Sequence, residues 1–171
     1  MIATGRSTAY YYVDVPYIAF WGSKYSSFSK KYRMQDLADD VNGGQLANLT
    51  FIDNVGTAIN ETGGLSGDDH PVADIRNGQS FLNEVYDILR RGPQWDKTLL
   101  VINYDEWGGF FDHVPPPEAH DTNPDGRQRG FRVPCMIISP FARRHHVAHR
   151  VYDHTSVLRM IEWRYGLDPL T

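Results

Sequence analysis

Two adjacent carboxylates, Asp105 and Glu106, directly follow an apolar run, Thr98–Ile102. In open α/β sheets, ligands bind beyond the carboxyl ends of strands, where the turning backbone lets neighbouring side chains converge. Two ionised carboxylates at such a point repel each other unless a cation lies between them or one keeps its proton. A hard divalent metal relieves that repulsion, and Gly108-Gly109 lets the backbone approach a ligand closely. The pattern indicates a metal site, and the alternative is a solvated acidic turn, because acidic residues are mostly exposed.

Two histidines lie where they can assist such a site. His113 follows Glu106 by seven residues, and Asp112 can orient its ring. The alternative for His113 is a hydrogen-bonded histidine in a loop. His70 stands just ahead of a predicted helix and can face the strand ends from there.

The alternative for His70 is that it is a bystander to helix capping. Asp68 or Asp69 would then cap the helix, since aspartate is a favoured capping residue.

The C-terminal part of the chain holds most of the imidazoles, because six of the seven histidines lie between His113 and His154. The run Arg143–Arg150 is basic but has no carboxylate or cysteine, so it matches no metal template and suggests a solvated or substrate-facing loop. Asp153-His154 precedes the last predicted helix. Either this pair caps the helix, or His154 points into the site.

Composition limits what the chain can be. With 171 residues, 41% apolar, 22% charged and a net charge of −4, it is typical of one globular domain. The mild acidity gives no sign of a nucleic-acid partner, and no apolar run reaches the roughly 18–20 residues of a membrane helix. Contact with a membrane surface stays open. No phosphate-binding glycine loop and no G-x-S-x-G turn is present, so no nucleophile has a recognisable motif.

The elements that must position these residues can be read from periodicity and turn signals. Residues 34–44, 72–92 and 153–166 are predicted helices, the second with an apolar repeat of 3.6 residues and a stop at Gly92-Pro93. Thr155 or Ser156 is expected to cap the last one. Residues 48–53, 98–104 and 133–139 are predicted strands, and their continuous apolar runs favour a parallel sheet covered on both faces.

Strand, helix and strand give one βαβ unit with a right-handed crossover, followed by a third parallel strand at residues 133–139. Residues 12–21 can form a further extended segment, which Pro16 would confine to an edge. The expected fold is α/β. Three confident strands are few for such a sheet, so either strands are hidden in the first 50 residues or the fold is incomplete.

With these residues in view, the chain resembles the C-terminal portion of the phosphoesterase family, which contains phosphatidylcholine-type phospholipases C and metal-dependent acid phosphatases. The resemblance covers roughly residues 34–170 and is carried by four stretches, "LTFID", "DDHPVADIRNGQSFLNEVYDILRRGPQWDKTLLVINYDEWGGFFDHVPPP", "RVPCMIISPFAR" and "YDHTSVLRMIEWRYGL". It implies an alkaline-phosphatase-like α/β/α sandwich with a mainly parallel sheet. Residues 1–171 are then expected to be the C-terminal part of a phosphoesterase domain.

The resemblance also implies hydrolysis of a phosphate ester or phospholipid by a Ser or Thr nucleophile, with one or more divalent metal ions of unspecified identity. Asp105 and Glu106 match the family's metal-binding pair. His70 matches a histidine expected to contact phosphate or transfer a proton. His113 and His154 match further family histidines, taken here as catalytic and substrate-binding respectively. Family members are often exported, but localisation is not indicated by this sequence.

Two features depart from the family pattern. Position 107 is Trp, where the family more often has a polar residue, and the "ENRSFDH"-type segment and the segment with the nucleophile are not found. A fragment that is non-catalytic, or that only binds metal or a partner, is therefore the rival hypothesis. A sulfatase-like hydrolase is a third option, disfavoured because Cys135 lies inside an apolar strand.

Overall fold

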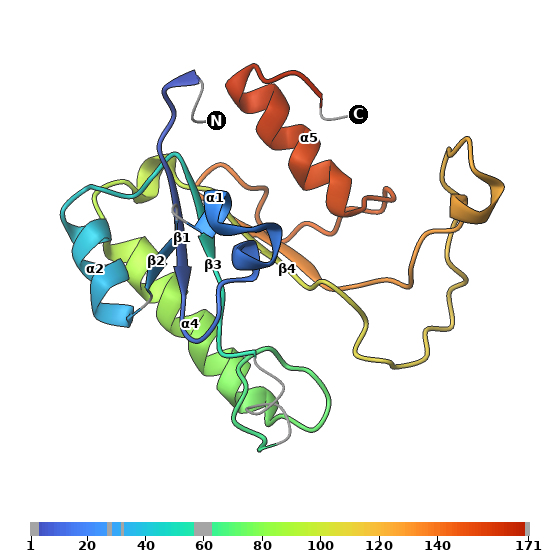
Figure 1. The fold of residues 1–171 in the computed structure, drawn as a ribbon, viewed down its shortest axis with the longest axis horizontal. Helices are drawn as coiled ribbons and strands as arrows, with labels where there is room; N and C mark the ends of the chain where they lie inside the picture. The colour runs from blue at the N-terminus through green and yellow to red at the C-terminus, as the bar shows by residue number, and fades with distance from the viewer. Residues whose placement is uncertain (1–3, 27–28, 32, 57–62, 170–171) are drawn as a thin grey trace.

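The larger sheet has three parallel strands in the order β2-β1-β3. The computed structural model describes residues 4–26, 29–31, 33–56 and 63–169. Within them, β1 spans Thr8–Tyr12, β2 spans Ser29–Lys31 and β3 spans Leu49–Ile52 (Figure 1). The predicted strand at residues 48–53 is confirmed. The prediction of an extended segment at residues 12–21 was wrong, because β1 ends at Tyr12 and Tyr17–Trp21 forms a 3₁₀ helix. The described part of the first 50 residues does hold two further strands, β1 and β2.

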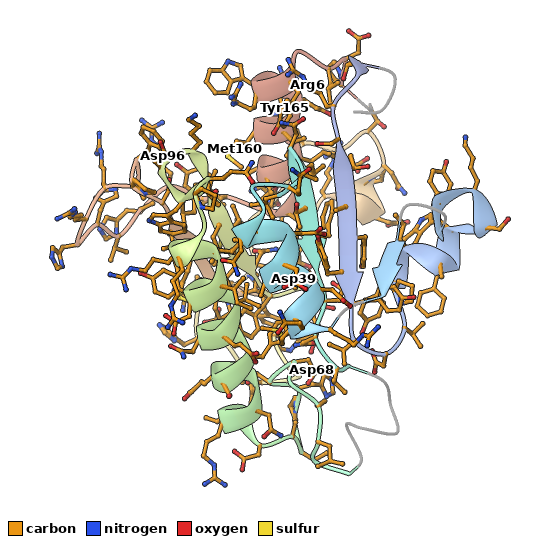
Figure 2. The ribbon with its side chains drawn as sticks, turned by 90° about the vertical axis from the view of Figure 1, so that its left-hand side faces the viewer. Arg6, Asp39, Asp68, Asp96, Met160 and Tyr165 are labelled. Carbon is orange, nitrogen blue, oxygen red and sulfur yellow. The ribbon has the colours of Figure 1, made fainter. Side chains whose placement is uncertain are left out.

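The core lies between this sheet and two helices, α2 (Met34–Asn42) and α4 (Ile75–Arg91). Figure 2 shows both helices on one side of the strands, with α1 (Ser23–Ser26) on the other. Each helix repeats apolar residues at helical spacing, and those side chains meet the sheet. The cluster of buried apolar side chains comprises Ala9, Tyr11, Leu37, Val41, Val85 and Leu89.

Helix α4 begins at Ile75, later than it would if Asp68 or Asp69 were its cap. Its N-cap is Asp74, whose carboxylate accepts a hydrogen bond from the backbone N–H of Arg76 at 3.0 Å. Neither Asp68 nor Asp69 caps this helix, so both remain available to shape the loop around His70. The helix ends at Arg91 before Gly92, as predicted, with two arginines at the negative end of its dipole.

The second sheet corrects the predicted topology. Strand β4 (Leu100–Asn103) pairs with β5 (Cys135–Ile138) in an antiparallel register, Leu100 opposite Ile138. The expected third parallel strand is therefore antiparallel, and β3 and β4 belong to separate sheets in the described part of the chain.

One physical reason explains why the direction of β5 and the sheet of β4 were predicted wrongly. A continuous apolar run predicts a strand but carries no information on its direction, which is fixed by the route of the connection. Here residues 105–134 leave β4, form an arm that reaches away from the rest of the chain (Figure 1), and return beside the end of the same strand. Met136 and Ile137 are 44% and 56% exposed, so β5 is not covered on both faces as expected.

Three short 3₁₀ helices, η2 (Tyr17–Trp21), η3 (Trp95–Lys97) and η4 (Pro124–Gly126), complete the connections among the described residues. The last α-helix, α5 (His154–Tyr165), ends at Gly166 in the left-handed conformation, as predicted for a helix-terminating glycine. Asp153 is the N-cap, and Ser156 completes a capping box, so the prediction that Thr155 or Ser156 caps the helix was wrong.

Candidate active site

The turn after β4 places Glu106 against its own backbone. Its Oε1 accepts a hydrogen bond from the N–H of Gly108 at 2.8 Å. Gly108 and Gly109 have φ of +68° and +74°, in the left-handed region where a residue with a Cβ is strained. The glycine pair therefore fixes the direction of the Glu106 carboxylate, while Asp105 stays exposed beside it.

His70 faces this carboxylate. Its Nε2 lies 3.7 Å from Glu106 Oε1, and its Nδ1 lies 3.2 Å from the carbonyl oxygen of Pro71. Because a carbonyl only accepts, Nδ1 donates, and the neutral ring then has its lone pair at Nε2. The side chains of His70 and Glu106 are 47% and 37% exposed, so a ligand can reach His70 Nε2. His70 and Glu106, far apart in sequence, are thus brought together as predicted.

The loop that carries His70 is held by Asp68. Asp68 Oδ1 accepts hydrogen bonds from the Oγ of Ser66 at 2.6 Å and from the backbone N–H of His70 at 3.0 Å. Ser66 is fully buried. A carboxylate that receives two donors inside one short loop orders that loop, so the His70 ring starts from a fixed backbone.

Asp69 connects the same loop to β4. The hydroxyl of Tyr104 donates a hydrogen bond to Asp69 Oδ2 at 2.5 Å. Asp69 has a φ of +63°, and its Oδ1 is buried with no partner among the described residues. Burial raises the pKa of Tyr104 to about 12, and the bond to Asp69 acts in the same direction.

His154 contacts the residue that follows β4. Its Nε2 lies 2.9 Å from the backbone carbonyl oxygen of Tyr104, one residue before Asp105. Asp153 caps α5 at the same time, as the first of the two alternatives for this pair supposed. The N-terminus of α5 is thereby placed at the exit of β4, close to the predicted carboxylates.

A further carboxylate lies at the end of the neighbouring sheet. The hydroxyl of Tyr10 donates to Asp53, which directly follows β3. Burial raises the pKa of Asp53, the bond from Tyr10 opposes that shift, and the charges of Asp14 and Asp105 add to it. Asp14, Asp53 and Asp105 therefore gather negative charge where β1, β3 and β4 end.

His113 is placed differently. Its side chain is 83% exposed, and its Nδ1 lies 3.7 Å from Asp112 Oδ1, too far for a hydrogen bond. Asp112 instead accepts two bonds of 2.8 Å from the guanidinium of Arg132. Within the described residues, no hydrogen bond or ion pair joins His113 to His70 or Glu106.

The predicted metal ligands do not form a complete set here. Across the part of the chain that the structure describes, no group of three or more His, Cys, Asp or Glu side chains is arranged to hold a metal ion. Asp105 and Glu106 supply oxygen donors of the kind that hard divalent cations prefer, but a full shell would need further donors.

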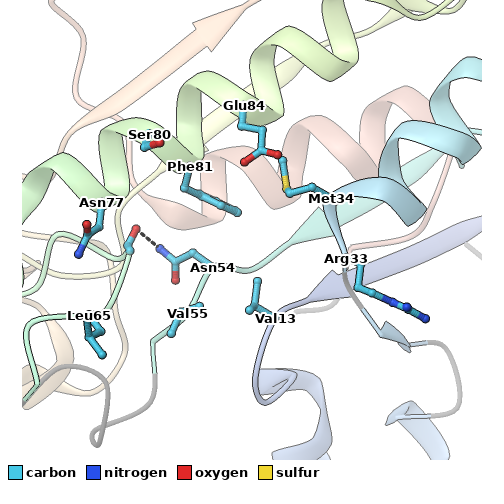
Figure 3. Close-up of a pocket in the computed structure, with 11 residues that line it drawn as sticks. Val13, Arg33, Met34, Asn54, Val55, Leu65, Asn77, Ser80, Phe81 and Glu84 are labelled. Atoms are coloured by element: carbon cyan, nitrogen blue, oxygen red, sulfur yellow. Dashed lines mark hydrogen bonds between the residues drawn. The ribbon is translucent and has the colours of Figure 1, made fainter.

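A cavity of about 580 Å³ lies beside the loop that carries His70 (Figure 3). Polar and apolar side chains both line it, and the amide of Asn54 donates to the carbonyl of Gly67 at its wall. None of the predicted site residues lines it, so we do not assign it to the chemistry of the β4 exit. The lining residues are Val13, Arg33, Met34, Asn54, Val55, Leu65, Gly67, Asn77, Ser80, Phe81 and Glu84.

Comparison with protein families matches residues 3–168 to the phosphoesterase family. This chain belongs to the phosphoesterase family. Relatives include non-specific phospholipase C6 of Arabidopsis thaliana, which is 34% identical over 92% of this chain and 34% of its own length. Phospholipase C B of Mycobacterium tuberculosis strain H37Rv is 34% identical over 77% of this chain and 27% of its own length. The chain thus spans about one third of the length of the curated relatives it matches.

None of the chain's described helices is long and apolar enough to cross a bilayer. Sequence reasoning missed Tyr104, Asp69, Asp53 and Asp14. The rule that selected Asp105, an acid just past the end of a strand, could also have selected Asp53 after the strand at residues 48–53.

Proposed function

We propose that this chain carries part of the active site of a phosphoric ester hydrolase of the phospholipase C or acid phosphatase type. The observation that supports this most is the pairing of His70 Nε2 with Glu106 Oε1 at the exit of β4. Family membership and relatives named as phospholipases C support a phosphate ester, and specifically a phospholipid, as the substrate. An alkaline-phosphatase-like sandwich is the fold proposed for the whole domain.

In this proposal His70 moves a proton. With Nδ1 donating to Pro71, its Nε2 is the free nitrogen, which can carry a proton to the oxygen of a leaving alcohol and take one up again. Glu106 Oε1 lies 3.7 Å from that nitrogen, so Glu106 can orient the ring toward the substrate. His154 lies where a substrate oxygen beyond Tyr104 can be oriented.

Asp105 and Glu106 are the proposed metal ligands. A divalent cation bound there would offset the carboxylate charges and polarise a phosphoryl oxygen. The exposed carboxylate of Asp105 and the free oxygen of Glu106 are the atoms that remain available for it. His113, exposed at the base of the connection, is proposed to contact substrate only after this segment moves toward His70.

The rival function is a metal-binding or interaction fragment without turnover. The observation that favours it is that no nucleophile with a recognisable motif is found in the sequence. The two functions differ in a measurable way, since only the hydrolase turns over substrate.

The test is hydrolysis of p-nitrophenyl phosphate and phosphatidylcholine by the 171-residue chain, with Mn²⁺, Mg²⁺ or Ca²⁺, alongside calorimetric metal titration. We expect metal binding that weakens at least roughly tenfold in Glu106→Gln and in Asp105→Asn, with His120→Ala, an exposed histidine on the arm, as the control.

Turnover that His70→Ala abolishes supports the hydrolase. Metal binding without turnover supports the fragment. Metal binding unaffected by either carboxylate change would show that the metal assignment is wrong.

A further inference from the structure

The segment between β5 and α5 is the most basic part of the chain. Residues 143–150, "RRHHVAHR", hold three arginines and three histidines, although the whole chain has a net charge of −4. All eight residues are exposed. In Figure 2 the pale salmon loop leading to α5 projects away from the strands, and its side chains end in nitrogen. The charge is therefore concentrated on one accessible surface.

These cations are not used for internal ion pairs. Elsewhere, arginines such as Arg91 and Arg132 lie within 4 Å of a carboxylate. Among the residues that the structure describes, none of the arginines or histidines of 143–150 has such a partner. An arginine cluster without internal counter-ions keeps a positive potential that attracts an anionic partner.

Large apolar side chains lie within and beside this cluster. Phe141 is 80% exposed, Val147 is 71% exposed, and Val151 and Tyr152 are 66% and 63% exposed. Basic residues interleaved with exposed apolar and aromatic side chains are typical of segments that lie in the headgroup region of a bilayer. A nucleic acid partner would bind the arginines through its phosphates but would leave Phe141 and Val147 in water.

We propose that residues 141–152 form a docking surface for membranes that contain anionic phospholipids. The arginines bind the negative headgroups, and the apolar side chains enter the boundary between headgroups and acyl chains. This inference does not depend on hydrolysis, because a chain without turnover would still bind through this segment.

The test is co-sedimentation of the 171-residue chain with vesicles of phosphatidylcholine alone and with 30% phosphatidylserine. We expect binding to the anionic vesicles that weakens as salt rises, since salt screens exposed charges. Replacing Arg143, Arg144 and Arg150 with Gln should weaken binding on the order of 100-fold, and Phe141→Ser roughly tenfold. The matched control replaces three exposed cations of α4 and η3, Arg90, Arg91 and Lys97, with Gln and should bind like the parent chain.

Three results would overturn the proposal. The first is equal affinity for neutral and anionic vesicles, and the second is equal loss in the two triple variants. The third is tight binding to polyuridylic acid with no binding to anionic vesicles, which would assign the surface to a nucleic acid. Circular dichroism shows whether each variant is still folded, so that weaker binding can be attributed to the substituted side chains. Salt titration of vesicle binding by the parent chain tests the contribution of charge without any substitution.

Discussion

Tyr104 donates its phenolic hydrogen to Asp69, a residue 35 positions earlier, across 2.5 Å. This bond joins the strand that ends at the carboxylate pair to the loop that presents His70. Tyr104 also offers its carbonyl oxygen to His154 Nε2 at 2.9 Å. One residue of β4's exit thus contacts both of the other segments that build the candidate site.

Tyr104→Phe should destabilise the protein. The change removes the hydrogen bond that Tyr104 donates to Asp69 Oδ2. The Oδ1 of the same carboxylate is already buried with no partner among the described residues. Losing a hydrogen bond to a charged group lowers the free energy of unfolding by about 1.5–3 kcal/mol. Urea denaturation measures it, with Tyr152→Phe, at an exposed tyrosine, as the control. Equal stability of the two variants would contradict the role given to this bond.

Stability should decline in alkaline solution. Burial raises the pKa of Tyr104 to about 12 in the folded protein, and a tyrosine in the unfolded chain has a pKa of about 10. Between these values the unfolded chain loses the proton first, so the folded state binds more protons and stability falls as pH rises. Tyr10 and Tyr11, whose pKa values burial also raises, add to the same slope. Thermal unfolding between pH 9 and 12 tests this, and Tyr104→Phe should show a shallower decline.

From the sequence, a local rule could select candidate residues, but contacts that depend on packing could not be predicted. Asp105 and Glu106 were selected because two adjacent acids directly follow an apolar run. The position of His70 near Glu106 was suggested by a helix packed between two strands of one sheet, although β3 and β4 belong to separate sheets in the described part of the chain. The bond between Tyr104 and Asp69 was not predictable, because it depends on a positive φ at Asp69 that no neighbouring pattern requires. The direction of β5 was missed for a related reason, since only the path of the arm decides it.

Gly78→Ala should destabilise the protein although alanine is the better helix former. Gly78 is buried within α4, and a Cβ there would lie 2.2 Å from Asp69 Oδ1 and 2.9 Å from the carbonyl oxygen of Gly67. Such overpacking costs about 1–3 kcal/mol, more than the gain of about 1 kcal/mol in helix propensity. Asn83→Ala, at an exposed position of the same helix, is the control and should not destabilise. A higher melting temperature for Gly78→Ala would show that Asp69 does not lie against this glycine.

Arg132→Ala should loosen the arm formed by residues 113–131. The guanidinium of Arg132 holds Asp112 at the base of the arm with two bonds of 2.8 Å, and this partner keeps the pKa of Asp112 well below its usual range. Limited proteolysis should cut the arm of the variant faster. Because a lowered carboxyl pKa contributes stability that declines below the ordinary carboxyl value and is fully lost only below the folded value, the parent chain should loosen progressively below about pH 4. It should match the variant only in stronger acid. Arg127→Ala, whose Nε bonds only the backbone oxygen of Asp121 within the arm itself, is the control. Cleavage of both variants at the parent rate would contradict the anchoring role of Arg132.

Gly108→Ala should disturb the candidate site more than the fold. Gly108 has a φ of +68°, and a Cβ would lie 3.3 Å from Cδ of Pro71, the residue after His70. Left-handed backbone costs about 1–2 kcal/mol for a residue with a side chain, so the turn is expected to open and carry its N–H away from Glu106 Oε1. The affinity for Mn²⁺ and any turnover should then fall, while the far-ultraviolet spectrum stays that of the parent. Gly130→Ala, where a Cβ meets open space, is the matched control. If both variants bind Mn²⁺ like the parent chain, the direction of the Glu106 carboxylate does not depend on the glycine turn.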